Sequence, residues 1–404
     1  MAENQKKLML LGGLRYLLPV IEAAHRHGIH VITVDYMPDN IAHRYSDEYH
    51  NVSIIDKEAV LALAQKLQID GIMSFAVDPG VVAAAYTAEK MGLPFQCSYE
   101  AACILQDKSR FRQFLADNGF NVPNARGYRE TDDAMADVDY FNWPVIVKPV
   151  DSAGSKGVTR VDDPANLPSA IAHALDSSPS RHFIIEDFLE LDGYQSSTDV
   201  FTVDGELLHC PFSDQLFDKT AVNPYVPAIE IWPSTMPIAV QQELRSELQR
   251  LFKLLECKTG IYNVEARLCK NGKAYIMEVS PRGGGNRIAE LQRFASGIDL
   301  IEAEMLKALD LPLCEVSDGN QTDIWCNYIL HSNVDGFFSE IKYSEGFKED
   351  CVVGEGILVK KGDMIRPFTG ANQSLGTIFL RFNTRDELNR FVNAPNQFIS
   401  IVTE

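Results

Sequence analysis

The sequence has few basic residues for its length, and this shortage limits the partners it is expected to bind. Its 404 residues include 37 lysines and arginines against 56 aspartates and glutamates, which gives a formal net charge of −19. Proteins that bind nucleic acids normally present a basic face to the phosphates. We therefore expect no nucleic-acid partner.

The chain also lacks a long apolar run. The first apolar stretch, Leu8 to Leu11, ends at Gly12-Gly13, and no later stretch is long enough to cross a bilayer. That first stretch is also too short for the core of a signal peptide. We therefore expect a cytoplasmic enzyme with no membrane partner.

Several common functional motifs are missing as well. None of the eight cysteines lies at C-x-x-C spacing, which argues against zinc ribbons and disulfide frameworks. The phosphate loop G-x-x-x-x-G-K-[ST] is absent, and the dinucleotide motif G-x-G-x-x-G is incomplete because Leu17 stands at its third glycine. Asp35 is the one dinucleotide-like feature left. The sequence also shows no Ser-His or Cys-His arrangement of the kind that would indicate a protein nucleophile.

The spacing of apolar residues predicts a fold of class α/β, with α+β character in part. Strand and helix patterns alternate from residue 6 to about 95, which is typical of a parallel, doubly wound sheet. Later patterns predict antiparallel strands and a β-rich end with a terminal helix from Thr384 to Asn393. Residues 214–237, rich in aromatics and proline, are predicted to form an ordered substrate loop. The predicted domains are residues 1–106, 107–315 and 316–404.

A predicted hairpin in the second domain carries two acidic residues. Apolar strand patterns flank Asn271-Gly272, a hairpin turn signal, so that Glu265 and Glu278 are expected to lie close together. Carboxylates on apolar strands need a cation or hydrogen bonds to offset the cost of burial. With Ser280 and Arg282 just beyond, the pattern indicates a Mg²⁺ site beside an anionic group. A surface hairpin with two solvated glutamates is the alternative.

A second constellation consists of Lys108, Lys148 and the small-residue loop from Asp151 to Gly157. A lysine at a strand end can hold one phosphate, while glycines leave backbone N–H groups free to hold others. The loop is flexible enough to act as a lid over a triphosphate. The alternative is a lysine that reaches solvent beside an exposed turn.

A third, weaker signal follows another strand. The segment from Glu186 to Leu189 can offer backbone groups to an adenine edge and a carboxylate to a ribose. Acidic residues at strand ends are more often simply solvated.

In this order, the motifs resemble those of the ATP-grasp superfamily, from the first strand to about residue 310. The run from Pro281 to Gly285, with Ile288 to Leu291 and Gly297 to Leu300, looks most like the carbamoyl-phosphate-synthetase-like group. That group includes L-amino-acid ligases and glycinamide-ribonucleotide-synthetase-like proteins. The resemblance implies an N-terminal parallel α/β domain, a small lid at about residues 124–186, a large antiparallel-sheet ATP domain and a small C-terminal β-rich domain.

The resemblance also implies ATP and Mg²⁺ (or Mn²⁺) as cofactors and gives roles to the matching residues. For the nucleotide these are Lys108 and Lys148 on the phosphates, Ser152, Gly154, Ser155 and Gly157 in the lid loop, Glu186, Asp187 and Leu189 at the adenine, and Gln195 at the ribose. The implied metal ligands are Glu265, Glu278 and Ser280, and the implied catalytic residues are Arg282 and Lys148.

Two of these positions depart from the family pattern. Ser280 stands where an asparagine metal ligand is usual, and its hydroxyl would bind a cation more weakly. Gln195 stands where a ribose-binding glutamate is common, although an amide can still bond a ribose. These departures put metal and ribose binding in doubt.

Four further residues are candidates for contacting a substrate. Arg267, Asn286 and Arg287 lie on either side of the acidic pair, and an arginine fork suits a substrate carboxylate. An equally good explanation for these three residues is that they neutralise the nearby carboxylates. Asp78 follows an N-terminal strand, at the edge where such sheets bind ligands.

The resemblance implies an ATP-dependent carboxylate–amine ligase that forms an acyl phosphate and then an amide. We expect its partners to be a small-molecule carboxylate, such as an amino acid, and an amine, and a homodimer is left open. The alternatives are a purine-pathway ligase similar to glycinamide-ribonucleotide synthetase, a catalytically weakened ATP-binding protein and an NAD-linked enzyme.

Overall fold

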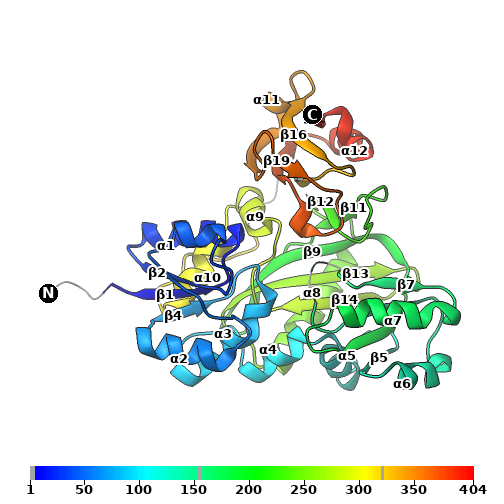
Figure 1. The fold of residues 1–404 in the computed structure, drawn as a ribbon, viewed down its shortest axis with the longest axis horizontal. Coiled ribbons are helices and arrows are strands. Elements are labelled where there is room, and N and C mark those ends of the chain that lie inside the picture. Colours follow the sequence, from blue (N-terminus) through cyan, green and yellow to red (C-terminus); the bar gives the residue numbers. More distant parts are fainter. Residues whose placement is uncertain (1–4, 153, 155, 320–322) are drawn as a thin grey trace.

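The protein is described by a computed structural model that covers residues 5–152, 154, 156–319 and 323–404 (Figure 1). Ser155, one of the predicted lid residues, lies outside the described residues. Among the described residues, no helix has both the length and the apolar character that a bilayer-crossing segment needs.

The N-terminal part is the predicted parallel, doubly wound sheet. Its strands lie in the order β3 (Glu48–His50), β2 (His30–Val34), β1 (Lys7–Leu11) and β4 (Gly71–Met73), and all three pairings are parallel. Successive residues of β1 face opposite sides, so that Leu8 and Leu10 join one apolar core and Met9 and Leu11 join the other. The first core contains residues of α1 (Leu18–Arg26) and α10 (Leu300–Ala308), and the second contains residues of α2 (Lys57–Leu67) and α3 (Asp78–Met91).

Strand β4 is shorter than its apolar pattern predicts. The pattern runs on to Ala76, but the strand ends at Met73. Ala76 takes a positive φ of 56°, and its N–H donates to Gly283 O at 3.1 Å. The chain therefore turns out of the sheet to meet a glycine-rich segment more than 200 residues away.

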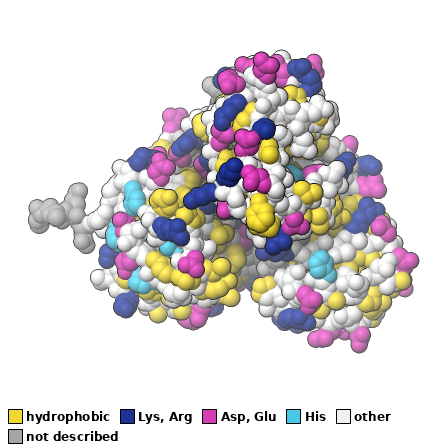
Figure 2. Space-filling view, turned by 45° about the horizontal axis from the view of Figure 1, so that its top comes forward, with side chains coloured by type: hydrophobic (Ala, Val, Ile, Leu, Met, Phe, Trp, Pro, Cys, Tyr) yellow, Lys and Arg dark blue, Asp and Glu magenta, His cyan; other side chains and the backbone are white. Residues whose placement is uncertain are grey.

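The lid is a separate antiparallel sheet with its own apolar core. Its strands lie in the order β5 (Ala125–Tyr128), β8 (Phe183–Asp187), β6 (Val145–Pro149) and β7 (Thr159–Val161), with α6 (Thr131–Ala136) and α7 (Leu167–Asp176) packed on them. Helices α4 (Tyr99–Gln106) and α5 (Lys108–Asp117) lead into the lid from the N-terminal part. Figure 2 shows a hollow between the N-terminal part and the lid, and acidic and basic side chains interspersed on the visible face.

The central sheet has nine strands within the described part of the chain. Its order is β14 (Ala274–Ser280), β13 (Gly260–Cys269), β9 (Leu191–Val203), β11 (Asp214–Phe217), β12 (Pro227–Trp232), β15 (Ile324–Leu330), β19 (Gly376–Phe382) and β17 (Val352–Ile357), and β10 (Glu206–His209) pairs with β9. Helices α8 (Ile238–Leu254) and α9 (Ile288–Ser296) pack against it.

The predicted loop at 214–237 is therefore wrong in part, because it contains two strands. Ala228, Ile229 and Ile231 of β12 are buried in one core with Cys326 and Tyr328 of β15. The prolines at both ends of β12 hid this short strand from the sequence pattern.

The C-terminal part is β-rich, as predicted, but only some of it forms a sheet of its own. Strands β18 (Met364–Ile365), β16 (Gly336–Tyr343) and β20 (Ile399–Thr403) form a three-stranded sheet, whereas β15, β17 and β19 continue the central sheet. Helix α12 (Arg385–Asn393) confirms the predicted last helix, and a short helix, α11 (Phe347–Cys351), precedes β17.

Candidate active site

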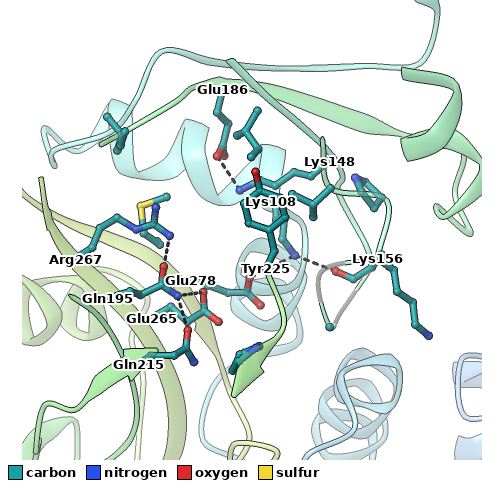
Figure 3. Close-up of a pocket in the computed structure, with 18 of the residues that line it drawn as sticks. Lys108, Lys148, Lys156, Glu186, Gln195, Gln215, Tyr225, Glu265, Arg267 and Glu278 are labelled. Atoms are coloured by element: carbon teal, nitrogen blue, oxygen red, sulfur yellow. Dashed lines mark hydrogen bonds and ion pairs between the residues drawn. The ribbon is translucent and has the colours of Figure 1, made fainter. Parts of the chain in front are cut away.

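The predicted hairpin is formed by β13 and β14, and it brings the two glutamates together. Glu265 and Glu278 are directly opposite each other in the register of the two strands. The turn contains Gly272 with a φ of +76°, a conformation that glycine adopts without strain. Both carboxylates border a cavity of about 270 Å³ between the central sheet and the lid (Figure 3).

The cavity gathers most of the predicted nucleotide, metal and substrate residues. Those that line it are Asp78, Lys108, Lys148, Ser152, Gly154, Glu186, Asp187, Leu189, Gln195, Glu265, Arg267, Glu278 and Arg282. Gly157, Ser280, Asn286 and Arg287 are described but do not line it.

Lys108 enters the cavity at the N-terminus of α5. The helix begins there because the Asp107 carboxylate accepts hydrogen bonds from the N–H groups of Ser109 and Arg110, at 2.9 and 3.0 Å. The Lys108 ammonium lies 3.4 Å from Glu278 Oε2 and donates to Ser152 O at 3.2 Å. It therefore joins a carboxylate of the hairpin to the start of the lid loop.

Lys148 and Glu186 form a buried ion pair on the lid side. Val145 and Val147 of β6 face the lid core, so the alternating Lys148 faces the cavity. Its Nζ lies 2.7 Å from Glu186 Oε2, and Arg112 Nε lies 2.8 Å from the other carboxylate oxygen. Figure 3 shows Lys148 and Glu186 pointing toward each other.

Burial and charge shift both pKa values in this group. Burial, opposed by the attraction of Glu186, lowers the pKa of Lys148 to about 8. Burial alone would raise the pKa of Glu186, but Arg112 and Lys148 outweigh it and hold that pKa at about 2. The carboxylate is therefore charged at neutral pH, and the lysine is still mostly protonated there.

Arg112 was missed by the sequence analysis. It lies one helical turn after Lys108, on the same face of α5, and that i, i+4 spacing is the signal that could have found it.

The lid loop and the segment after β8 complete this side. Ser152 and Gly154 line the cavity, whereas Gly157 packs against Ser177, with a built Cβ only 2.6 Å from Ser177 Cβ. Asp187 accepts from the backbone N–H and side-chain amide of Asn142, at 2.9 and 2.8 Å. Its carboxylate is therefore engaged within the lid, and Phe188 and Leu189 present the apolar surface here.

Arg282 meets Asp78 in a bidentate pair between the central sheet and α3. Arg282 Nε donates to Asp78 Oδ1 at 2.9 Å, and the terminal NH2 donates to Oδ2 at 2.8 Å. Burial would raise the pKa of Asp78, but the Arg282 guanidinium lowers it below its usual range. Ser280 Oγ also donates to Asp78 Oδ1, at 2.9 Å, and accepts from Gln106 Nε2 at 2.7 Å. The Ser280 hydroxyl is thus occupied by protein partners, and its predicted metal role stays a prediction.

Asn286 and Arg287 directly follow the glycine run, Gly283–Gly285, and do not line the cavity. Arg287 donates twice to Glu290, at 2.9 and 2.7 Å, and once to Thr377 Oγ1 at 3.2 Å. The Asn286 carbonyl accepts from the Asn327 amide. These contacts hold the glycine run against the C-terminal strands.

Asp199 was also missed, although it supports the same run. Its Oδ1 accepts from Gly284 N at 2.7 Å and from Asn263 Nδ2 at 3.0 Å. The side chain is fully buried, and burial raises its pKa to about 6. Asp199 is the one charged residue in the strand segment Ser196–Thr202, and this is the sequence signal that could have identified it.

The paired glutamates fit a divalent cation. Burial and the nearby charge of Glu278 raise the pKa of Glu265, so neighbouring positive groups do not fully offset the repulsion. Within the described part of the chain, no cluster of three or more acidic, histidine or cysteine side chains is placed to hold a metal. Mg²⁺ is usually bound by one or two carboxylates together with substrate phosphates, and two glutamates satisfy that requirement.

Comparisons with known proteins identify the family of the chain. A model of the ATP-grasp domain matches residues 113–285, and a model of the ATP-grasp N-terminal domain matches residues 21–95, so the two together cover more than half of the chain. The chain is 27% identical to a formate-dependent phosphoribosylglycinamide formyltransferase from Synechococcus sp. (strain WH7803), over 76% of this chain and 77% of that protein.

The chain aligns with part of one further relative and with the full length of another. It is 25% identical to the carbamoyl phosphate synthase large chain of Pseudothermotoga lettingae, over 69% of this chain but 26% of that protein. The crystal structure of an L-amino acid ligase from Bacillus licheniformis superposes with a TM-score of 0.81 at 21% identity, with full coverage of both chains. The chain therefore belongs to the ATP-grasp superfamily.

Proposed function

We propose that the protein joins an amino acid or a similar small carboxylate to an amine, through an acyl phosphate formed with ATP. One observation carries the proposal: two lysines, two facing glutamates and an arginine–aspartate pair border a single cavity. An acyl-phosphate ligase needs cations for a triphosphate, carboxylates for its metal and a charged group beside the reacting carboxylate.

The nucleotide would lie between the lid and the central sheet. Lys108 and Lys148 would face its phosphates, and the apolar surface of Phe188 and Leu189 would face its base. Glu265 and Glu278 would hold Mg²⁺, which offsets charge on the transferring phosphoryl group when it is bound. With the lid closed, water would be excluded from an acyl phosphate that otherwise hydrolyses.

The reaction would run in two steps. A carboxylate oxygen of the first substrate attacks the γ-phosphorus of ATP, and the bond from that phosphorus to the ADP oxygen breaks. The amine then attacks the acyl carbon, inorganic phosphate leaves, and the amine loses a proton. Arg282 would stabilise negative charge on the transferring group, while Asp78 holds its guanidinium in place.

A purine-pathway ligase is the second candidate, supported by the similarity to the phosphoribosylglycinamide formyltransferase over three quarters of the chain. Its amine would be a phosphorylated ribosylamine or its glycinamide derivative. The two candidates differ in whether the amine substrate carries a phosphate.

A paired screen of carboxylates against amines tests both candidates by phosphate release. Amino-acid pairs are expected to release phosphate and form a dipeptide that mass spectrometry detects. Release only with phosphorylated ribosylamines would favour the second candidate. Binding of ATP without release for any pair would contradict both.

A further inference from the structure

A row of polar side chains runs across four neighbouring strands, from the floor of the cavity into the sheet. Arg267, Gln195, Gln215 and Glu230 stand directly opposite one another in the registers of β13, β9, β11 and β12. Gln195, Gln215 and Glu230 are each at most 5% exposed. Polar groups at such depth need hydrogen-bond partners, so the row is a built feature of the sheet.

The hydrogen bonds in this row run in one direction. Arg267 donates to Gln195 Oε1, and Gln195 Nε2 donates to Gln215 Oε1 at 2.9 Å (Figure 3). Gln215 Nε2 in turn donates to Glu230 Oε1. Arginine has only donors, so the amide of Gln195 must turn its oxygen toward Arg267. That orientation fixes both following bonds.

Glu230 closes the far end of the row. It is fully buried, its Oε2 lies 3.2 Å from Ser213 Oγ, and Ser213 Oγ donates to Ser197 O at 2.7 Å. Burial raises the pKa of Glu230 well above its usual range. The row is therefore anchored at one end by a guanidinium and at the other by a carboxyl group held in the sheet.

The row reaches the paired glutamates through Gln195. Its Nε2 also lies 3.2 Å from Glu265 Oε2, so both amide hydrogens have acceptors: Gln215 and Glu265. The nitrogen thus has no hydrogen left to donate to a ribose hydroxyl, and the amide oxygen already accepts from Arg267. A glutamate at this position could not donate to either acceptor, and it would add a third negative charge beside Glu265 and Glu278.

We propose that Gln195, held in orientation by Arg267 and Gln215, is a positioning residue that aims the Glu265 carboxylate at the divalent cation instead of binding the ribose. The inference rests on the proposed function, because it takes Glu265 to be a metal ligand. It assigns Arg267 to the support of the metal site and not to a substrate carboxylate.

The test uses Gln195→Met, which keeps most of the side-chain length but removes every hydrogen bond. Mn²⁺ binding to the full chain is measured by electron paramagnetic resonance in the presence of a non-hydrolysable ATP analogue. Loss of a residue that orients a metal ligand typically weakens metal binding by about 10- to 100-fold, and we expect a loss in this range. Gln215→Met is expected to weaken Mn²⁺ binding less, because it removes only the support behind Gln195.

The matched control is Gln113→Met, on the exposed face of α5, which should leave Mn²⁺ binding unchanged. Titration calorimetry with ATP, 2′-deoxy-ATP and 3′-deoxy-ATP provides the second readout. If Gln195 positions Glu265, the ratio of the three affinities stays the same in Gln195→Met. Unchanged Mn²⁺ binding, or a preference for ATP over the deoxy nucleotides that disappears in this variant, would overturn the proposal.

Neither measurement requires turnover, so a failure of the proposed ligase reaction would appear separately, as the absence of phosphate release. Circular dichroism and thermal unfolding confirm that each variant is folded. If Gln195→Met does not fold, Gln215→Met carries the decision: unaltered Mn²⁺ binding in that variant contradicts the positioning role.

Discussion

Nucleotide binding should weaken as the pH rises through about 8, because Lys148 loses its proton there. Burial sets the pKa of this lysine at about 8 in the free protein. A pKa of about 8 leaves roughly a tenth of the side chains charged at pH 9, so an affinity that depends on the ammonium falls about ten-fold between pH 7 and pH 9. The phosphates of the nucleotide do not titrate in this range, since their last pKa is near 6.

Two variants separate Lys148 from other groups in this experiment. Lys148→Arg keeps its charge throughout, so its affinity should change little from pH 7 to 9. Arg112→Met removes a positive neighbour that lowers the pKa of Lys148, so the loss of nucleotide affinity in this variant should move to higher pH. Calorimetric titration with ADP at pH 7, 8 and 9 measures all three proteins. Equal losses in wild type and Lys148→Arg would refute the reasoning, because the titrating group would then lie elsewhere.

The same titration of Lys148 should raise the free energy of unfolding as the pH rises, whereas it lowers the affinity for the nucleotide. Its folded pKa of about 8 lies below the unfolded value of 10.5. Between these values the unfolded chain binds a proton that the folded chain does not, so the contribution of Lys148 to the free energy of unfolding rises with pH. The slope approaches about 1.4 kcal/mol per pH unit within this window. Urea unfolding at pH 7.5 and 9.5 in wild type and Lys148→Arg isolates this contribution.

Three further changes have expected outcomes. Glu278→Gln should lower metal-dependent phosphate release by about 100-fold or more without unfolding the chain, because one of the two carboxylates that fit the metal is lost; turnover equal to wild type would remove Glu278 from the metal site. Arg282→Lys should lower kcat by roughly 100-fold, because an ammonium cannot form the bidentate pair with Asp78. A kcat equal to wild type in steady-state kinetics would contradict this role for Arg282. Gly284→Ala should lower the free energy of unfolding by about 1–3 kcal/mol, because a Cβ at this position would lie 2.7 Å from Asn263 Nδ2. A thermal midpoint equal to wild type would contradict the crowding at this glycine.

The parts of the site that local patterns encode could be predicted from sequence. The Glu265–Glu278 pair follows from a turn signal and strand alternation, which together determine the register of a hairpin. Lys148 follows from its alternation on an apolar strand. The parallel sheet of the N-terminal part follows from alternating strand and helix patterns, and it is confirmed.

The remaining contacts depend on distant parts of the chain and leave no local signal. Asp78 and Arg282 are 204 residues apart, and only the packing of α3 against the central sheet joins them. The row from Arg267 to Glu230 depends on three strand registers, one of which involves a strand hidden by its flanking prolines. Side-chain partners of this kind become visible only when the whole sheet is assembled.

The central sheet continues without a break from the hairpin that carries Glu265 and Glu278 to the C-terminal strands. Strand β12 pairs with β11 on one side and with β15 on the other, over four residue pairs from Ile229 to Trp232. A chain shortened at about residue 315 would leave β12 as an open edge with unpaired backbone groups and an uncovered apolar face, a form that promotes aggregation. The C-terminal segment therefore cannot be treated as a removable module, and the ATP-grasp domain of this protein is complete only when the last 90 or so residues are present to finish its sheet.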